Sequence, residues 1–154
     1  MNKYHSLRDA TIGLSDGLII PFALATGMSN VVMSSPTVIT ACLTAAMAGA
    51  VTMTFGGYME GKKYNTSASP LRSALIIGLS YALGGLLTTL PYHFIDIPRD
   101  ALRWSAFLTL SVLFLTGYAD NILHGGKGWQ GGLRTVITGA VAGIAAFLIS
   151  GVFT

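Results

Sequence analysis

Five apolar segments, each about long enough to cross a membrane, constrain this chain more than any other feature. They lie near residues 7–28, 37–58, 71–92, 102–123 and 131–153. A spanning helix needs about 20 mostly apolar residues. Backbone groups in hydrocarbon must pair within the protein, so only helices or a closed barrel can cross. These runs do not alternate with a period of two, which favours helices. We therefore predict an all-α membrane protein with five transmembrane helices in one domain, residues 1–154.

Charged side chains are too few to coat a water-soluble globule. They make up 10% of the chain, whereas an ordinary soluble domain has about 25%. Of the nine lysines and arginines, only Arg99 and Arg103 fall on one side of the membrane if the segments alternate. The other seven fall on the opposite side: Lys3, Arg8, Lys62, Lys63, Arg72, Lys127 and Arg134. The positive-inside rule then predicts a cytoplasmic N-terminus. Because the basic residues do not cluster, no nucleic-acid partner is expected.

Other classes of protein find little support in the motifs. A cleaved signal peptide would need an uninterrupted apolar core, which Asp9 and Asp16 break. Cys42 is the single cysteine, so no internal disulfide is expected. The chain has no P-loop, CxxC or HExxH motif and no nucleophile–base pair, so we do not expect an enzyme. A membrane enzyme would have to depend on Asp120 and His124.

Asp16 is an acidic residue inside the first apolar segment, where a charge costs free energy. An ionisable residue within a membrane span is by default a candidate functional residue. On a helix, His5, Asp9 and Asp16 project within about 40° of one another. Asp16 follows Asp9 by seven positions, so it lies about 10 Å deeper at 1.5 Å per residue. The first segment thus carries one polar stripe that leads from its cytoplasmic end into the membrane.

Pro21 adds a second polar feature to the same segment. Proline has no N–H, so the carbonyl of Gly17, four residues earlier, loses its helical partner. We expect Gly13 and Gly17 to keep the region around Asp16 open. A carboxylate, a free carbonyl and room for water suit a small hard cation. The alternative is a proline-kinked helix in which Asp16 bonds to a neighbouring serine or threonine.

Candidate ligands also occur in two later segments. Met53 and Glu60 are seven residues apart, so they share a helix face, and glycine and alanine surround it. A thioether is a soft ligand that suits softer metal ions, although a methionine can equally serve packing. Asp120 and His124 are four residues apart and can present two ligands on one face. The alternative for this pair is a polar helix end at the membrane surface.

Glycine is abundant, with 19 residues in the chain. In lipid, small residues let helices approach one another closely. Gly139 and Gly143 in the fifth segment, and Gly78 and Gly85 in the third, therefore predict a tightly packed bundle. This pattern permits oligomerisation but does not identify a function.

Two stretches resemble the vacuolar iron transporter family. The first, residues 8–29, reads RDATIGLSDGLIIPFALATGMS and resembles the family's first transmembrane helix. The second, residues 49–64, reads GAVTMTFGGYMEGKKY and resembles the second helix. The segments LPYHF and ITGAVAGIAAFLISGVF resemble the family's third and fifth helices more loosely. The resemblance covers most of the chain, and the first motif is the most specific.

This resemblance implies a homodimer of five-helix protomers that exports Fe²⁺, and often Mn²⁺, from the cytosol in exchange for protons. Metal is then a transported substrate, and no permanently bound cofactor is expected. The family's aspartate and methionine that line the ion path at the dimer interface match Asp16 and Met53. An acidic residue seven positions earlier matches Asp9. We predict that metal first meets Asp9, together with Glu60 and His5.

The chain departs from the family in two places. Only EGKKYNTSASPLRS, residues 60–73, stands where many members carry a long glutamate-rich metal-binding insertion. His5 stands where members often have a glutamate. Both departures concern how metal is captured and which metal is preferred.

Two alternative functions remain open at this point. One is transport of another divalent cation, such as Mn²⁺, Co²⁺ or Ni²⁺, since aspartate and methionine do not separate these ions sharply. The other is a membrane scaffold protein whose glycine faces serve oligomerisation. The compact loops favour a prokaryotic plasma membrane as the location, or a vacuolar-type membrane in a eukaryote.

Overall fold

The computed structural model describes residues 3–64 and 69–152, and the regular structure in these ranges is all helical. The elements in chain order are α1 (Lys3–Val31), α2 (Ser35–Tyr64), α3 (Pro70–Thr89), the 3₁₀ turn η1 (Leu90–His93), α4 (Pro98–Leu123) and α5 (Gly128–Val152). The five α-helices, the third together with η1, are long and apolar enough to cross a membrane. The predicted five-span, all-α fold is therefore confirmed.

Helix ends differ from the predicted spans for local reasons. Proline opens α3 and α4, where its missing N–H costs no helical hydrogen bond. The predicted span 71–92 is not one α-helix, because α3 ends at Thr89 and Pro91 lies in η1. Helix α1, by contrast, continues through Pro21 to Val31. The predicted end of the fifth span, residue 153, lies outside the described residues.

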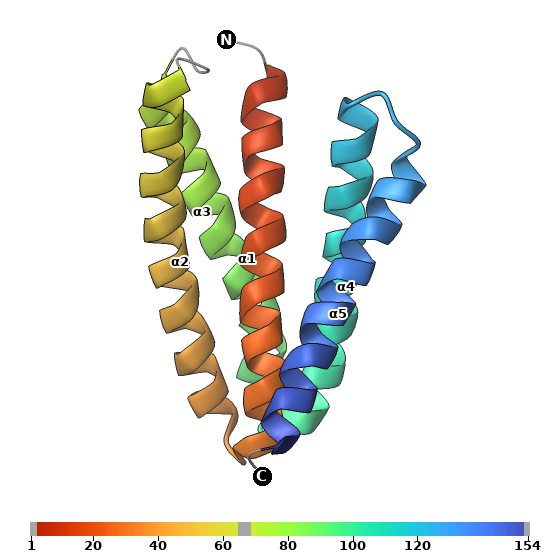
Figure 1. Cartoon of the computed structure of the whole chain (residues 1–154). Helices are drawn as coiled ribbons and strands as arrows, with labels where there is room; N and C mark the ends of the chain where they lie inside the picture. Colours follow the sequence, from red (N-terminus) through yellow and green to blue (C-terminus); the bar gives the residue numbers. More distant parts are fainter. Residues whose placement is uncertain (1–2, 65–68, 153–154) are drawn as a thin grey trace.

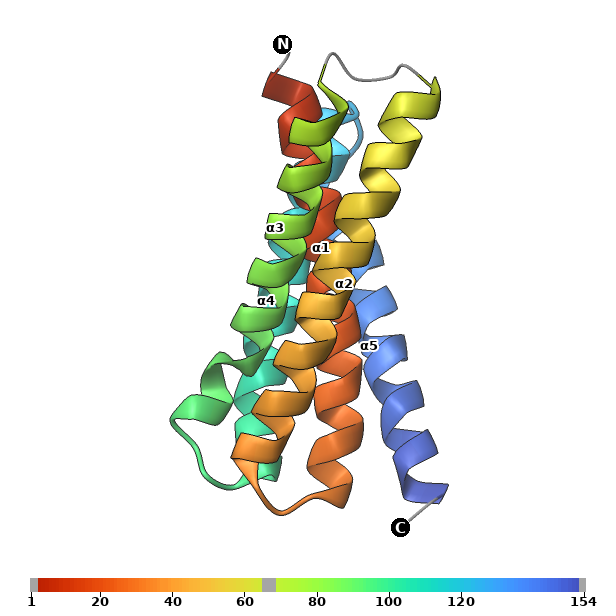
Figure 2. The same ribbon diagram turned by 90° about the vertical axis from the view of Figure 1, so that its left-hand side faces the viewer.

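Helix α1 lies at the centre of the bundle, between the pair α2 and α3 and the pair α4 and α5 (Figure 1). It contacts all four of the other α-helices, whereas α5 touches only α1 and α4 within the described residues. The view turned by 90° shows the same central position (Figure 2). We call the end with the chain's N-terminus and the α2–α3 and α4–α5 connections the N-terminal end, and the opposite end the C-terminal end (Figure 1).

Glycines permit the closest contact between α1 and α3. A Cβ at Gly84 would lie 2.6 Å from the carbonyl carbon of Gly17 and 2.7 Å from the nitrogen of Leu18. In α5, a Cβ at Gly143 would lie 2.8 Å from the ring of Phe22. The bundle is therefore as tightly packed as its glycine content predicts.

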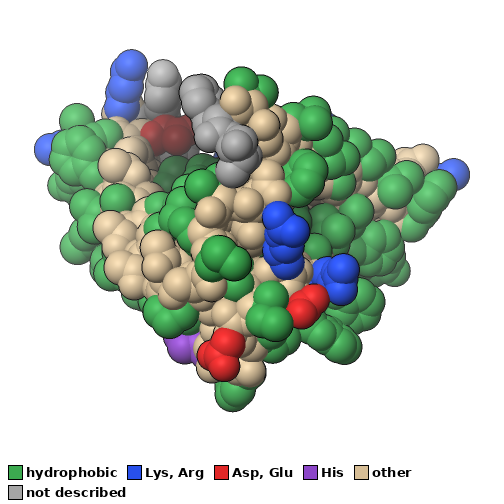
Figure 3. Space-filling view, turned by 90° about the horizontal axis from the view of Figure 1, so that it is seen from below, with side chains coloured by type: hydrophobic (Ala, Val, Ile, Leu, Met, Phe, Trp, Pro, Cys, Tyr) green, Lys and Arg blue, Asp and Glu red, His purple; other side chains and the backbone are tan. Residues whose placement is uncertain are grey.

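Buried hydroxyl groups join the helices toward the C-terminal end. Ser29 and Tyr92 share a hydrogen bond of 2.8 Å, and the Ser105 hydroxyl donates to the Thr88 carbonyl at 2.7 Å. The Ser35 hydroxyl donates to the Ile95 carbonyl at 2.7 Å. Figure 3 shows this end of the molecule, with its few acidic and basic side chains set among hydrophobic ones. These bonds fix α1, α2 and α4 to the segment around η1.

The basic residues divide between the two ends as the sequence predicts. Arg99 and Arg103 lie in the first turns of α4, at the C-terminal end. Seven others stand in or beside helix ends at the N-terminal end: Lys3, Arg8, Lys62, Lys63, Arg72, Lys127 and Arg134. Which of the two ends faces the cytosol stays a prediction.

Candidate metal-binding site

A cavity of about 320 Å³ lies between α1, α2 and α3 near the N-terminal end. Four candidate ligands from the sequence line it: His5 and Asp9 of α1, and Met53 and Glu60 of α2. The remaining lining residues are Arg8, Ile12, Gly56, Gly57, Gly61, Ser73 and Ile77. We call this space the N-terminal cavity.

Helical spacing explains why these side chains meet. His5, Asp9 and Ile12 are separated by four and three residues, so they stand on one face of α1. Met53 and Glu60 share a face of α2, as their separation of seven residues predicts. Between them, a Cβ at Gly56 would meet nothing within 4 Å. The absence of a side chain at Gly56 therefore keeps this part of the cavity hollow.

Asp9 is held in place by a residue of another helix. The Ser73 hydroxyl, in the first turn of α3, donates a hydrogen bond to Asp9 Oδ2. A carboxylate keeps further lone pairs when one oxygen accepts such a bond. The cavity thus offers carboxylate oxygens from Asp9 and Glu60, an imidazole from His5 and a thioether from Met53. Oxygen donors suit hard cations, and sulfur and imidazole suit softer divalent ones.

Asp16 does not line the N-terminal cavity, because it lies one helical turn deeper. On each of the three helices, one residue lies four positions deeper than the deepest lining residue, and together these form a floor layer: Asp16 and Tyr81, which follow Ile12 and Ile77, and Gly49, which precedes Met53. The Tyr81 ring packs directly on Gly49, where a Cβ would lie 2.5 Å from the tyrosine oxygen. Tyr81 is 2% exposed and is close enough to Asp16 to interact with it electrostatically.

The Asp16 carboxylate makes no hydrogen bond or ion pair with any residue in the described ranges. Ser15, its neighbour, instead donates to the Thr116 hydroxyl at 3.4 Å. Asp16 itself is half-buried. The alternative in which a nearby serine or threonine satisfies Asp16 is therefore not what this structure shows. An acid that costs free energy in a membrane and has no protein partner is free to bind a cation or a proton.

The expectation that Gly13 and Gly17 keep the region around Asp16 open is wrong. A Cβ at Gly13 would overlap the backbone of Ile77, and one at Gly17 would overlap the backbone of Tyr81. At both positions, the missing side chain therefore lets α1 pack closely against the backbone of α3. The sequence could not distinguish these uses, since a missing side chain can leave a space or admit another backbone. Pro21 is itself buried, and its carbonyl accepts a 3.5 Å hydrogen bond from Cys42 Sγ.

Asp120 and His124 lie near each other at the end of α4, away from the N-terminal cavity. His124 Nδ1 is 3.6 Å from Asp120 Oδ1 and 2.8 Å from the Asp120 carbonyl oxygen. The His124 side chain is 58% exposed and the Asp120 side chain is 42% exposed. They form a polar helix end of the kind that the alternative interpretation describes.

The described part of a single chain does not supply a complete cage for a metal ion. Within residues 3–64 and 69–152, no group of three or more histidine, cysteine, aspartate or glutamate side chains could hold a metal. Met53 and Ser73 are outside that count and line the same cavity. The described residues provide a set of donors that is suited to divalent metal but incomplete.

Comparison with known proteins gives the family. The family model described as the VIT family matches residues 7–67 and 60–151, which is nearly the whole chain. This chain belongs to the VIT family. A "Vacuolar iron transporter 1" from Eucalyptus grandis is 30% identical, with 92% of this chain and 84% of that protein covered. The Arabidopsis thaliana "Vacuolar iron transporter 1" is 29% identical, with 94% and 84% covered. "Protein CCC1" of Saccharomyces cerevisiae is 25% identical, with 93% and 68% covered.

This VIT family member lacks residues that its relatives have. The alignment with the E. grandis protein runs over 208 positions, whereas this chain has 154 residues. The two family matches meet at residues 60–67, in the connection between α2 and α3. The extra residues of the relatives are therefore expected at that connection. These relatives come from plants and fungi and are in part named for the vacuole, so they give no support to the predicted prokaryotic plasma membrane.

The structure also adds residues that sequence reasoning on this VIT family member missed. Ser73 and Tyr81 of α3 contribute to the cavity and its floor layer, and Arg8 lines the cavity beside Asp9. Arg8 stands in the recognised first motif, but nothing in the pattern indicates that it faces the cavity. Ser73 and Tyr81 stand outside the motifs of the first two helices. Their roles depend on how α3 packs against α1 and α2.

Proposed function

We propose that this protein transports divalent transition metal, with Fe²⁺ as the main substrate and Mn²⁺ as a second one, out of the cytosol in exchange for protons. The observation that carries this proposal is the N-terminal cavity. It gathers Asp9, Met53 and Glu60 one helical turn away from Asp16, which has no hydrogen-bond or ion-pair partner among the described residues. Relatives over most of the chain are named vacuolar iron transporters, which supports iron as the substrate.

The layers suggest an order of events along the path. Asp9, Glu60 and His5 attract a hydrated cation into the cavity by charge and by oxygen and nitrogen donors. Met53, the deepest lining residue of α2, then offers a thioether that favours softer divalent ions over Ca²⁺ and Mg²⁺. Asp16 takes the ion one turn further inward. In this scheme Tyr81 belongs to the same layer as Asp16, which the ion reaches after Met53.

A second copy of the chain completes the site in this proposal. The described residues of one chain include no group of three or more histidine, cysteine, aspartate or glutamate side chains that could replace the water shell of a divalent ion. Two copies related by a two-fold axis would bring two Asp16 carboxylates and two Met53 thioethers to one place. The family resemblance implies such a homodimer, and the exposed apolar side chains of Ile12 and Ile20, each four positions from Asp16 on α1, leave room for a partner on that face.

Exchange with protons follows from competition at Asp16. A carboxylate within a membrane span that has no partner costs free energy, and either a proton or a cation can neutralise it. A proton gradient then removes metal on the side where protons are abundant. The seven basic residues at the N-terminal end favour that end as the cytosolic one, so metal enters through the N-terminal cavity.

The test is Fe²⁺ flux into proteoliposomes under an imposed pH gradient. Wild type is compared with Asp16→Asn and with Asp120→Asn, a matched change of an acid outside the path. We expect flux that follows the gradient in wild type and in Asp120→Asn, and at least a tenfold loss in Asp16→Asn. Equal flux in all three proteins would remove Asp16 from the mechanism.

The two alternative functions give different results in the same assay. If wild type carries another divalent ion but not Fe²⁺, the path stands and the proposed substrate is wrong. If folded wild type carries no divalent ion, the scaffold function gains support instead. A metal competition panel with Fe²⁺, Mn²⁺, Co²⁺ and Ni²⁺ separates the first case from the second.

A further inference from the structure

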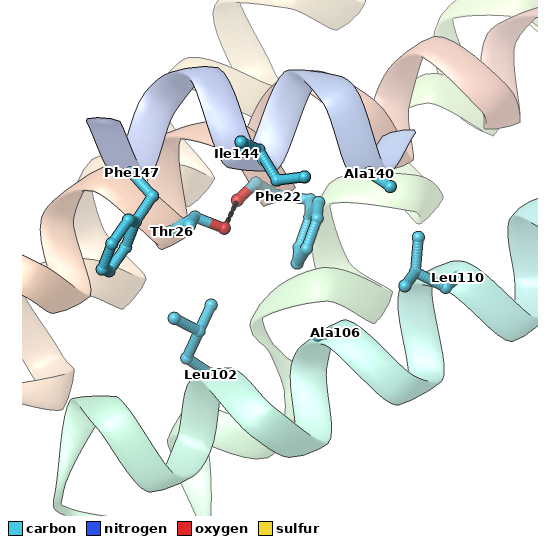
Figure 4. Close-up of a pocket in the computed structure, with 9 residues that line it drawn as sticks. Phe22, Thr26, Leu102, Ala106, Leu110, Ala140, Ile144 and Phe147 are labelled. Carbon is cyan, nitrogen blue, oxygen red and sulfur yellow. Dashed lines mark hydrogen bonds between the residues drawn. The ribbon is translucent and has the colours of Figure 1, made fainter. Parts of the chain in front are cut away.

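A second cavity lies between α4 and α5 at the C-terminal half of the bundle, and it shares no lining residue with the N-terminal cavity. Its volume is about 310 Å³, and we call it the α4–α5 groove. Figure 4 shows α1 at its floor, with Phe22 and Thr26, and the walls formed by Leu102 and Ala106 of α4 and by Ile144 and Phe147 of α5.

The groove has no group to bind water or metal. Thr26 contributes its only lining hydroxyl, and that hydroxyl already donates to the Phe22 carbonyl at 2.8 Å. The rim is apolar and exposed, since Ile144 and Phe147 are 60% and 49% exposed. Because both wall helices are candidate membrane spans, this rim faces the hydrocarbon of a bilayer. An empty groove there would forgo dispersion contacts on one side, and a hydrocarbon chain in the groove would restore them.

A basic residue stands at the mouth of the groove. Arg99 precedes Leu102 by three residues, so it lies on the groove side of α4, one turn closer to the membrane surface. It is exposed and has no ion-pair partner among the described residues. Arg103 likewise precedes a lining residue, Ala106, by three positions, but its guanidinium pairs with Asp100 at 3.1 Å. A guanidinium at the level of the headgroups is suited to binding a phosphate.

We propose that the α4–α5 groove binds one glycerophospholipid of the surrounding bilayer, with an acyl chain on Phe22 and Ala106 and its phosphate on Arg99. Charge complementarity at the mouth selects a lipid over a second copy of the chain, whose own α4 would bring another Arg99 to the same place. On the same end, the Asn30 amide donates to Ser150 Oγ at 3.1 Å. This bond ties α1 to α5 and holds the floor against one wall.

Native mass spectrometry of the purified full chain in mild detergent, titrated with dioleoyl phosphatidylglycerol, tests the proposal. We expect wild type to retain one lipid per chain. Arg99→Ala should weaken binding about fivefold, the effect of one arginine near a charged membrane surface, whereas the control Arg103→Ala should bind like wild type. Dioleoylglycerol, which has the same chains and no phosphate, should bind wild type and Arg99→Ala equally weakly.

Filling the groove provides a second, independent measurement. Ala106→Phe from α4, or Ala140→Leu from the opposite wall, should abolish the retained lipid, and size-exclusion chromatography checks that each variant is folded. Equal lipid binding by Arg99→Ala and Arg103→Ala would overturn the phosphate site. Full lipid retention in folded Ala106→Phe and Ala140→Leu would overturn the groove. If the filling variants changed the oligomeric state of the protein but retained as much lipid as wild type, the occupant of the groove would be a second copy of the chain. That result would also overturn the lipid proposal.

Discussion

The substitution Gly84→Ala tests the packing of the central helix most directly. The new methyl carbon would lie 2.6 Å from the carbonyl carbon of Gly17, 2.7 Å from the Leu18 nitrogen and 2.9 Å from the Leu14 oxygen. All three are backbone atoms, so no side chain can move aside. Carbon atoms prefer about 3.5 Å, so α1 and α3 must separate by about 1 Å. Overpacking of this kind costs about 1–3 kcal/mol of unfolding free energy.

The assay is unfolding in mixed detergent and SDS, followed by circular dichroism. The matched control is Gly56→Ala, also inside a helix, where the new methyl would meet nothing within 4 Å. We expect Gly84→Ala to unfold at lower SDS and Gly56→Ala to be unchanged or slightly more stable, since alanine has the higher helix propensity. Equal stability of the two variants would refute the close α1–α3 contact.

Three further substitutions test other parts of the molecule. Ser105→Ala removes a buried hydroxyl that donates to the Thr88 carbonyl at 2.7 Å, so it should lower the unfolding free energy by about 0.6–1 kcal/mol in the same assay. The control Ser111→Ala removes only a bond within its own helix and should cost less. The reverse order of the two costs would be inconsistent with the structure. Tyr81→Phe keeps the ring on Gly49 but removes a hydroxyl from the layer that holds Asp16, so metal flux should fall several-fold with unchanged stability. Unchanged flux would remove the hydroxyl from the path. Met53→Leu replaces a soft thioether donor by a side chain that cannot bind metal, so the ratio of Fe²⁺ to Mn²⁺ transport in a competition panel should fall. An unaltered ratio would remove Met53 as a determinant of selectivity.

The sequence predicted those features of the fold and the site that depend on a single helix. Apolar length gave the five spans, and the period of 3.6 residues placed His5 with Asp9 and Met53 with Glu60. The sequence did not predict the contacts that form between two helices. Asp9 and Ser73 are 64 positions apart, and no single-helix pattern indicates that they bond. Gly17 shows the same limit, since its role depends on the position of α3. The helical period of 3.6 residues did place Asp16 on the same face of α1 as Asp9. Only the packing of α1 against α2 and α3 showed that Asp16 lies deeper than the N-terminal cavity.

Cys42 has a consequence for chemical labelling of this protein. It is the single cysteine of the chain, it is 0% exposed, and its thiol is directed at the Pro21 carbonyl. Thiol reagents attack accessible thiolates, and a buried structural cysteine is inert. A cysteine introduced along the N-terminal cavity would therefore be the one reactive thiol of the folded chain. Its rate of modification from either side of a sealed vesicle would report directly which compartment reaches that depth, against almost no background.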